Sequence, residues 1–133
     1  INLTKTFIIA KTQKDSEIFY IGQNGKYINA NQIIITDDPP IIFGDFKINE
    51  FIDLQKILKH QKIDLKNINK YFYYKNKRWD LIFSNGVILR LPSKNYKDSI
   101  EIYKKLLINN NLKNIKVIDL RIINQIILTS NNE

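Results

Sequence analysis

The stretch KNKRWDLIFSNGVILRLPS, residues 75–93, is the part of the sequence that is most informative about the fold. An arginine and the only tryptophan open an apolar run, an Asn-Gly pair interrupts it, and Arg-Leu-Pro closes it. Residues 78–84 and 87–91 fit two strands, and the Asn85-Gly86 pair suits the positive φ angles of a two-residue turn between them. The sequence therefore predicts a β-hairpin.

The length of that turn predicts which residues face each other. In a two-residue hairpin Phe83 faces Ile88, and Leu81 faces Arg90. Arg90 then lies diagonally opposite Trp79 on the same face, within reach of a cation–π contact. The hairpin is expected to serve mainly as framework.

The regions on both sides of the hairpin alternate between strand and helix patterns. Spaced apolar residues predict helices over 48–61 and from Ser93 or Asn95 to the asparagine run at 109–111, with Asp45 or Asn49 capping the first helix. The stripe of the first helix comprises Phe51, Leu54 and Leu58, and that of the second comprises Tyr96, Ile100, Tyr103 and Leu107. β-Branched and aromatic runs predict strands over 4–12, 17–21, 27–28, 32–36, 41–44, 67–74, 115–121 and 125–129, with a turn at 22–25. This order indicates an α+β fold with a mainly antiparallel β-sheet and two amphipathic helices.

Length and composition restrict the class of protein. The chain has 133 residues, enough for one domain with a real core, and its 44% hydrophobic and 26% charged residues are ordinary for a globular protein. It contains no cysteine, so disulfides and zinc–thiolate sites are excluded. It contains no methionine and begins at Ile1, so we expect a fragment whose targeting or membrane segment could precede it.

The net charge of +8 raises the question of an anionic partner. Of the 21 cations, 18 are lysines spread from Lys5 to Lys116, which favours a solvated lysine surface and no nucleic acid partner. The alternative is a basic module that binds an anionic polymer, either nucleic acid or a cell-wall chain. The aromatic run 71–74 supports it, because aromatic rings can act as stacking platforms.

Signatures of catalysis are scarce. His60 is the only histidine, and phosphate-binding glycine motifs and a nucleophile elbow are missing. The chain is therefore predicted not to be an enzyme and to hold no metal or cofactor. Asp80 and Asp119 lie inside apolar strands, each two residues from an arginine, and we expect ion pairs there. A hydrolase that uses these two aspartates is a remaining alternative.

The three arginines, Arg78, Arg90 and Arg121, all fall in predicted strands of the C-terminal half. A guanidinium group can form two hydrogen bonds with one carboxylate, or stack on a ring, which an ammonium group cannot do. The arginines either tie the sheet to itself or form a surface that recognises an acidic peptide or a terminal carboxylate.

Several short motifs occur together in a fixed order. They are Asn24-Gly25-Lys26-Tyr27-Ile28, Pro40-Ile41-Ile42-Phe43-Gly44, Arg78-Trp79-Asp80-Leu81, Asn85-Gly86-Val87, Leu89-Arg90-Leu91-Pro92 and Ile118-Asp119-Leu120-Arg121. With this order and spacing, the chain resembles the C-terminal part of the cell division protein family FtsQ/DivIB over roughly residues 6–128.

The resemblance implies a single-pass protein of the bacterial inner membrane that acts in the division machinery at the septum. Its periplasmic part would comprise a POTRA domain followed by a β domain. Residues 1–12 would be the strand leaving a truncated POTRA domain, residues 13–130 the β domain, and residues 131–133 a frayed tail. The family is a non-catalytic scaffold that helps to position and restrain septal peptidoglycan synthesis.

The resemblance also implies the partner and its site. Family members bind FtsB, which pairs with FtsL as a coiled coil, by adding a strand beside the last strand. In this chain the partner-binding residues would be Arg121, Ile122, Ile123, Asn124, Gln125, Ile126, Ile127, Leu128, Thr129 and Ser130, with Arg78 and Arg90 as secondary candidates. Ile122 and Ser130 replace aromatic residues of better-known members, so the usual aromatic anchors are missing. The alternative is that residues 125–128 form a covered core strand.

Overall fold

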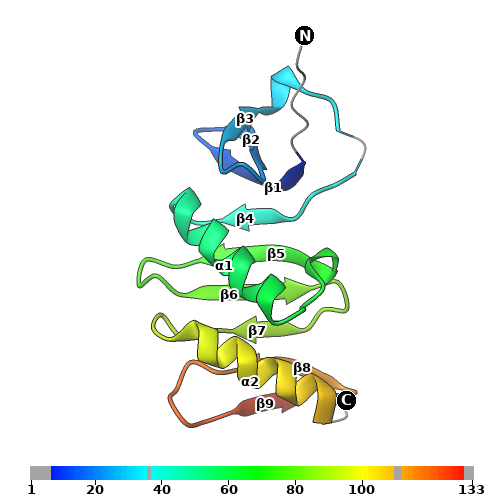
Figure 1. Cartoon of the computed structure of the whole chain (residues 1–133), viewed down its shortest axis with the longest axis vertical. Coiled ribbons are helices and arrows are strands. Elements are labelled where there is room, and N and C mark those ends of the chain that lie inside the picture. Colours follow the sequence, from blue (N-terminus) through cyan, green and yellow to red (C-terminus); the bar gives the residue numbers. More distant parts are fainter. Residues whose placement is uncertain (1–6, 36, 110–111, 131–133) are drawn as a thin grey trace.

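The computed structural model describes residues 7–35, 37–109 and 112–130. Within these residues, nine strands form one sheet, and two α-helices and two short 3-10 helices complete the fold (Figure 1). The helical elements are η1 (Ala30–Gln32), α1 (Ile48–His60), η2 (Leu65–Asn67) and α2 (Tyr96–Asn109). The strands are β1 (Ile8–Lys14), β2 (Glu17–Gly22), β3 (Tyr27–Asn29), β4 (Ile41–Phe43), β5 (Ile68–Tyr73), β6 (Trp79–Phe83), β7 (Ile88–Arg90), β8 (Ile115–Asp119) and β9 (Ile127–Ser130).

The strands follow the order β3-β2-β1-β4-β5-β6-β7-β8-β9 across the sheet. Five neighbouring pairs are antiparallel, and three are parallel: β1 with β4, β4 with β5, and β7 with β8. Parallel neighbours need a long crossover, and α1 and α2 lie in the crossovers β4–β5 and β7–β8. Both helices lie over the same side of the sheet (Figure 1). The predicted α+β fold, mainly antiparallel with two helices, is confirmed.

Helix α1 begins at Ile48, the predicted first residue, and its N-cap lies between the two predicted caps. Lys47 is the N-cap residue, and Glu50 supports it by accepting a 3.4 Å hydrogen bond at Oε1 from the Lys47 backbone N–H. The predicted caps at Asp45 and Asn49 are wrong, because the acidic residue of the first turn reaches back to the entering chain. The predicted apolar stripe is confirmed, and it is buried against the sheet at Phe51, Leu54 and Leu58.

Helix α2 packs on β6 through part of its predicted stripe. Ile100 and Tyr103 are buried, and the Tyr103 ring lies 5.6 Å from the Phe83 ring. Burial raises the pKa of Tyr103 to about 12. Leu107, in contrast, is exposed, so the stripe loses contact with the sheet toward the C-terminal end of α2.

The centre of the core is the tryptophan of the opening stretch. Trp79 is buried among the rings of Phe46, Phe51, Tyr71 and Tyr73, at centroid distances of 6.2, 6.2, 6.3 and 4.8 Å. Edge-to-face and tilted ring pairs add favourable quadrupole interactions to the burial of apolar area. The β6 strand therefore acts as framework, as predicted.

The polar atoms beneath α1 are paired. The Tyr71 hydroxyl accepts a 2.9 Å hydrogen bond from Gln55 Nε2, and the Tyr73 hydroxyl donates a 2.5 Å bond to Glu50 Oε2. Desolvation is the main cause that raises the pKa of Tyr71, and desolvation together with Glu50 raises the pKa of Tyr73 to about 12. These bonds join α1 to β5 at two places.

The β6–β7 hairpin has a three-residue loop, so the predicted two-residue turn is wrong. The loop comprises residues 84–86, with Gly86 at φ 90° donating its N–H to Phe83 O at 2.9 Å. The extra residue shifts the register by one, and Arg90 pairs with Asp80 instead of Leu81. Arg90 consequently lies on the face opposite to Trp79, and the predicted cation–π contact does not form.

Three predictions concern the N-terminal part of the chain. The predicted strand 32–36 is wrong for its described residues, 32–35, because η1 ends at Gln32 and no described strand follows before β4. At the N-cap of η1, Asn29 Oδ1 accepts a 2.9 Å hydrogen bond from the Asn31 N–H. A two-residue turn with positive φ values does occur, but at Asp15 and Ser16. The predicted boundary at residue 12 falls inside β1, which pairs with β2 and β4. The POTRA assignment of residues 1–12 stays a prediction, and residues 1–6 and 131–133 lie outside the described residues.

Candidate functional site

Strand β9 is the last strand of the sheet. It pairs antiparallel with β8, with Ile118 opposite Leu128 and Asp119 opposite Ile127. No described strand lies beyond it, because β9 ends the strand order. The strand comprises Ile127–Ser130, so it begins two residues later than predicted and extends one residue further. An edge strand presents backbone N–H and C=O groups to which another chain can add.

The ten predicted partner-binding residues all lie at this end of the molecule. Four form β9, and the other six, residues 121–126, connect it to β8. Within the connection, the Gln125 N–H donates to Ile122 O at 3.1 Å, and Asn124 adopts φ 64°. All ten residues are exposed, so the alternative of a covered core strand is wrong.

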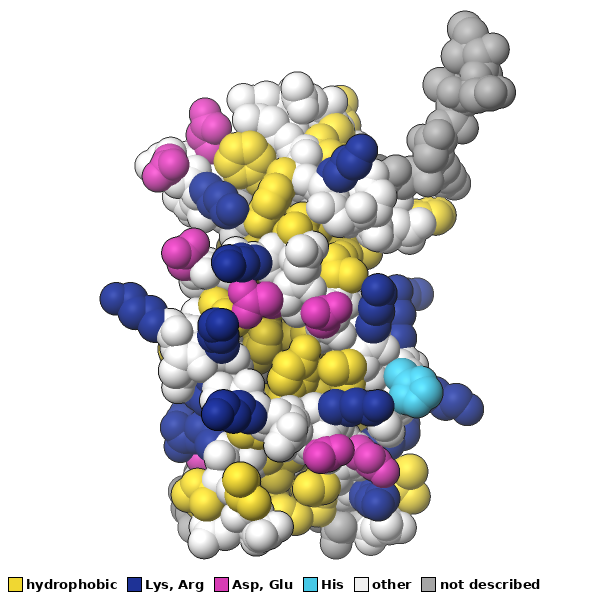
Figure 2. Space-filling view, turned by 60° about the vertical axis from the view of Figure 1, so that its left-hand side comes forward, with side chains coloured by type: hydrophobic (Ala, Val, Ile, Leu, Met, Phe, Trp, Pro, Cys, Tyr) yellow, Lys and Arg dark blue, Asp and Glu magenta, His cyan; other side chains and the backbone are white. Residues whose placement is uncertain are grey.

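Apolar side chains gather around this edge. Ile123 is 80% exposed, and the other exposed apolar residues of the segment are Ile122, Ile126, Ile127 and Leu128. Hydrophobic side chains also show at the lower end of the space-filling view, where α2 and β9 lie (Figure 2). A contiguous apolar edge of this kind is typical of an interaction surface.

Helix α2 forms one wall of a cleft beside the β8–β9 loop. The cleft has a volume of about 360 Å³, and Ile102 and Ser99 of α2 line it opposite Leu120, Ile122 and Ile126. No sequence pattern indicated Ile102 as a site residue, because only the packing of α2 beside the β8–β9 loop brings it to this cleft. Gln125 and Ile126, which directly precede β9, also line this cleft.

Arg121 is held by Asp119 at the end of β8. Arg121 Nη2 lies 2.7 Å from Asp119 Oδ2, and Arg121 Nε lies 2.9 Å from Oδ1. The backbone N–H of Arg121 also donates to Oδ1 at 3.0 Å. These hydrogen bonds lower the pKa of Asp119 below its usual 3.8 and raise the pKa of Arg121. The predicted ion pair is confirmed, and the Arg121 side chain stays 42% exposed.

Arg78 forms the corresponding pair with Asp80 on β6. Arg78 Nη1 binds Asp80 Oδ1, and the guanidinium carbon lies 4.5 Å from the centroid of the Tyr74 ring. The Tyr74 hydroxyl donates to Asp80 Oδ2 at 3.1 Å. Burial and the nearby Asp80 raise the pKa of Tyr74. This predicted ion pair is also confirmed, and Asp80 is buried within it.

Arg90 lies between the two aspartates. Its Cα is paired with that of Asp80 across β6–β7 and with that of Asp119 across β7–β8. Leu81, Leu89 and Ile118 of the same strands are buried beneath the helices, so alternation places Arg90 and both aspartates on the other face. We call Arg78, Asp80, Arg90, Asp119 and Arg121 the arginine–aspartate ladder.

The cations at the end of the ladder line a second cleft. It has a volume of about 550 Å³ and is lined by Arg78, Lys94 and Arg121, together with Pro92 and Ile122, which also line the cleft beside α2. No acidic residue lines this second cleft within the described part of the chain. An apolar cleft and a cationic cleft therefore adjoin each other beside the β8–β9 loop.

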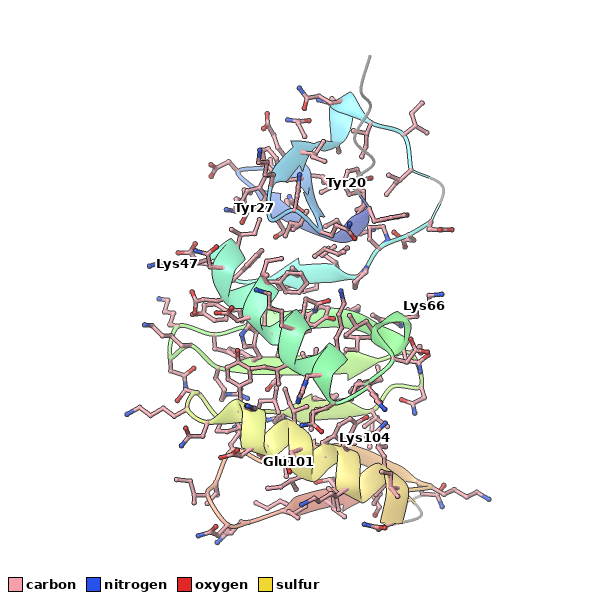
Figure 3. The ribbon with its side chains drawn as sticks, in the orientation of Figure 1. Tyr20, Tyr27, Lys47, Lys66, Glu101 and Lys104 are labelled. Carbon is pink, nitrogen blue, oxygen red and sulfur yellow. The ribbon has the colours of Figure 1, made fainter. Side chains whose placement is uncertain are left out.

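The two alternative functions, a module that binds an anionic polymer and a hydrolase, fit the structure less well. The rings of the run 71–74 divide between the two faces of β5, with Tyr71 buried beneath α1 and Phe72 stacked 4.8 Å from Phe43 on the other face. Lysines and arginines lie scattered among acidic side chains in Figure 2, and Lys47 and Lys66 lie at opposite edges of the ribbon in Figure 3. The hydrolase alternative would need Asp80 or Asp119 free, whereas both are bound to arginine.

Two further features of the structure concern membrane spanning and metal binding. Within residues 7–35, 37–109 and 112–130, neither helix is long and apolar enough to cross a bilayer. In the same residues, no three acidic or histidine side chains lie together in a way that could hold a metal ion.

Comparisons with known proteins agree with the fold and the motifs. The family described as "Cell division protein FtsQ/DivIB, C-terminal" matches residues 10–121, which is most of the chain. The chain is thus a cell division protein. It belongs to the FtsQ/DivIB family and carries the C-terminal domain of that family.

A solved structure gives a weaker likeness. The major extracytoplasmic domain of the trans isomer of the bacterial cell division protein DivIB from Geobacillus stearothermophilus is similar at 15% identity and a TM-score of 0.46. The likeness covers 83% of this chain and 99% of that chain. No curated protein matches the sequence. The family match ends at Arg121, so residues 122–130 lie outside it, and their role rests on the structure of this chain.

Proposed function

We propose that this domain is a non-catalytic scaffold of the bacterial division machinery that binds an FtsB-like protein by adding one of its strands to β9. FtsB-like and FtsL-like proteins would form the coiled-coil partner complex, and binding would help to regulate septal peptidoglycan synthesis. The observation that carries the proposal is the open edge of β9, which lies next to Arg121 and to exposed isoleucines.

Strand addition suits this edge for a physical reason. Main-chain hydrogen bonds to β9 would provide affinity, and alternate side chains of the partner would reach the apolar cleft beside α2 and the cationic cleft beside Arg121. A partner carboxylate at the cationic cleft would form charge-assisted hydrogen bonds. The preferred partner segment therefore combines apolar residues with at least one acidic residue.

The family also suggests where the domain acts. We propose that the domain lies outside the inner membrane, in the periplasm at the division septum, and that a single N-terminal membrane helix of the full-length protein anchors it. A POTRA domain would precede the β domain, with residues 1–12 as the connecting strand. Catalysis has no part in this proposal.

Co-purification with the extracytoplasmic segment of the FtsB-like protein of the same bacterium tests the proposal. Arg121→Glu should abolish co-purification, because it places a carboxylate where the partner carboxylate would bind. The thermal midpoint should change by less than about 4 °C, since the Arg121 side chain is 42% exposed and Arg90 still lies opposite Asp119. Equal recovery of the partner with parent and variant would remove Arg121 from the site.

A proline scan tests strand addition itself. N–H groups alternate along a strand, so of Leu128 and Thr129 one donates toward β8 and the other points outward. Proline at the outward position should prevent binding and leave the fold intact, whereas proline at the inward position should destabilise the sheet edge. If the two prolines affect binding and stability equally, the partner does not bind by main-chain addition.

A further inference from the structure

The arginine–aspartate ladder contains three guanidinium groups and two carboxylates. Arg78 is paired with Asp80 and Arg121 with Asp119. The third cation, Arg90, has a buried Nε that no hydrogen-bond acceptor contacts. A buried donor without an acceptor is unfavourable, so its presence in this position needs a reason.

The position of Arg90 gives it access to both acids. Its Cα is directly opposite those of Asp80 and Asp119 on the neighbouring strands. Side chains that face each other in this way have Cβ atoms about 5 Å apart, which is well within the length of an arginine side chain. The charge of Arg90 also contributes to the lowered pKa of Asp119.

Binding of a partner creates a problem for Asp119. Its side chain is only 12% exposed, and Arg121 is its hydrogen-bonded cation. If Arg121 turned toward a partner carboxylate, Asp119 would keep a largely buried negative charge with no cation bound to it. Such an uncompensated charge opposes the exchange.

We propose that Arg90 is the reserve counter-ion of Asp119, which lets Arg121 leave Asp119 and bind a partner carboxylate. Arg90 then donates its spare hydrogen bonds to Asp119, so no buried carboxylate is left without a cation. The ladder carries one more guanidinium group than carboxylate groups, and the partner carboxylate neutralises this additional positive charge.

In its biological role this inference rests on the proposed function, because it explains how Arg121 becomes available to a partner. The exchange itself, in which Arg90 pairs with Asp119 when Arg121 does not, concerns the free domain alone. Arg90 is thus a positioning residue that acts through Asp119 and Arg121.

The test measures the pKa of Asp119 in the free domain by carbon-13 NMR of its carboxyl group, with Asp119→Asn to assign the signal. The groups that face Asp119 are Arg90 from β7, Ile127 from β9 and Arg121 from its own chain segment. In Arg121→Ala the pKa should stay below 3.8, because Arg90 replaces the lost cation. Addition of Arg90→Gln should raise the pKa above 3.8, because no cation then compensates the burial.

Matched variants separate this effect from general electrostatics and from unfolding. In the Arg121→Ala background, Arg90→Lys should keep the pKa low, and Lys116→Gln, which removes the same charge from an exposed position on β8, should leave the pKa unchanged. The proposal is overturned if Arg121→Ala alone brings the pKa of Asp119 to 3.8 or above. It is also overturned if Lys116→Gln has the same effect as Arg90→Gln.

The single variant Arg121→Ala decides the question even if the double variant does not fold. No partner is present in this titration, so its outcome is separate from that of the proposed function. Failure of co-purification in parent protein would remove the proposed function and leave the exchange within the ladder to be judged on the titration alone.

Discussion

Arg121 and Asp119 form a fork at the end of β8, with Nη2–Oδ2 at 2.7 Å and Nε–Oδ1 at 2.9 Å. The pair is local, because the two residues are two positions apart in the chain. It fixes the guanidinium group next to the edge strand and keeps it 42% exposed. The same residue therefore follows the end of β8 and lines the cationic cleft that the proposed partner would occupy.

The fork predicts how stability depends on pH. The folded-state pKa of Asp119 lies below its usual 3.8, so the pair stabilises the fold above that value and loses its effect as the pH falls through the lower folded-state value. Asp119→Asn should therefore be less stable than the parent at about pH 7, and the difference should shrink as the pH falls below 3.8. Urea unfolding at several pH values measures this difference. A difference that stays constant with pH would show that the charge of Asp119 is not responsible.

The turn after β4 provides a test of packing. Gly44 has φ 110°, and a Cβ there would lie 2.1 Å from Tyr73 O, which is backbone and cannot move aside. Gly44→Ala should destabilise the domain by about 3 kcal/mol or more, because strain and a clash add together.

Gly25→Ala is the matched control for that change. Gly25 has φ 78°, but a Cβ there meets no atom within 4 Å, so only the backbone strain of about 1–2 kcal/mol applies. Urea denaturation of both variants compares the two effects. Equal losses of stability would mean that the close approach to Tyr73 is relieved at little cost.

The hairpin loops show why the strand register could not be predicted from the sequence. Asn85-Gly86 suggested a two-residue turn, but in this loop, as in the loop that contains Asn24-Gly25, only the glycine has a positive φ. The glycine ends a three-residue loop, and the extra residue moves the facing strand by one position. The sequence could place the turn and could not give its length, so Arg90 was assigned to the wrong face.

The candidate site was predictable in its local parts. Arg78–Asp80 and Arg121–Asp119 were found because residues two apart on a strand share a face. The position of Arg90 between both aspartates depends on the register of β6, β7 and β8, and the role of Ile102 depends on how α2 packs. The first relation depends on the length of the β6–β7 loop and on the crossover to β8, and the second on the packing of α2, so no local pattern encodes them.

The polar contact beneath α1 predicts a defined loss of stability. Tyr71→Phe leaves buried Gln55 Nε2 without its 2.9 Å acceptor, which should cost about 1–3 kcal/mol. Tyr71→Phe combined with Gln55→Leu removes both partners and should be less unstable than the sum of the two single variants. A double-mutant cycle by urea unfolding measures the coupling. Strict additivity would mean that the two groups do not depend on each other.

The isoleucines of the β8–β9 loop give the last prediction. Ile123 is 80% exposed and lines both the apolar and the cationic cleft. Ile123→Asp should leave the thermal midpoint nearly unchanged, because an exposed side chain contributes little to the fold. It should weaken binding of the FtsB-like segment by at least about tenfold, because an apolar contact is lost and a negative charge is placed where an acidic partner would lie.

Ile108→Asp is the control for that experiment. Ile108 is 70% exposed on α2, and it lines neither of the two clefts beside β9. The two variants change net charge and exposed apolar area in the same way, so titration calorimetry with the same partner segment isolates the effect of position. If Ile108→Asp weakens binding as much as Ile123→Asp, the partner responds to overall charge, and the β8–β9 loop is not part of the interface.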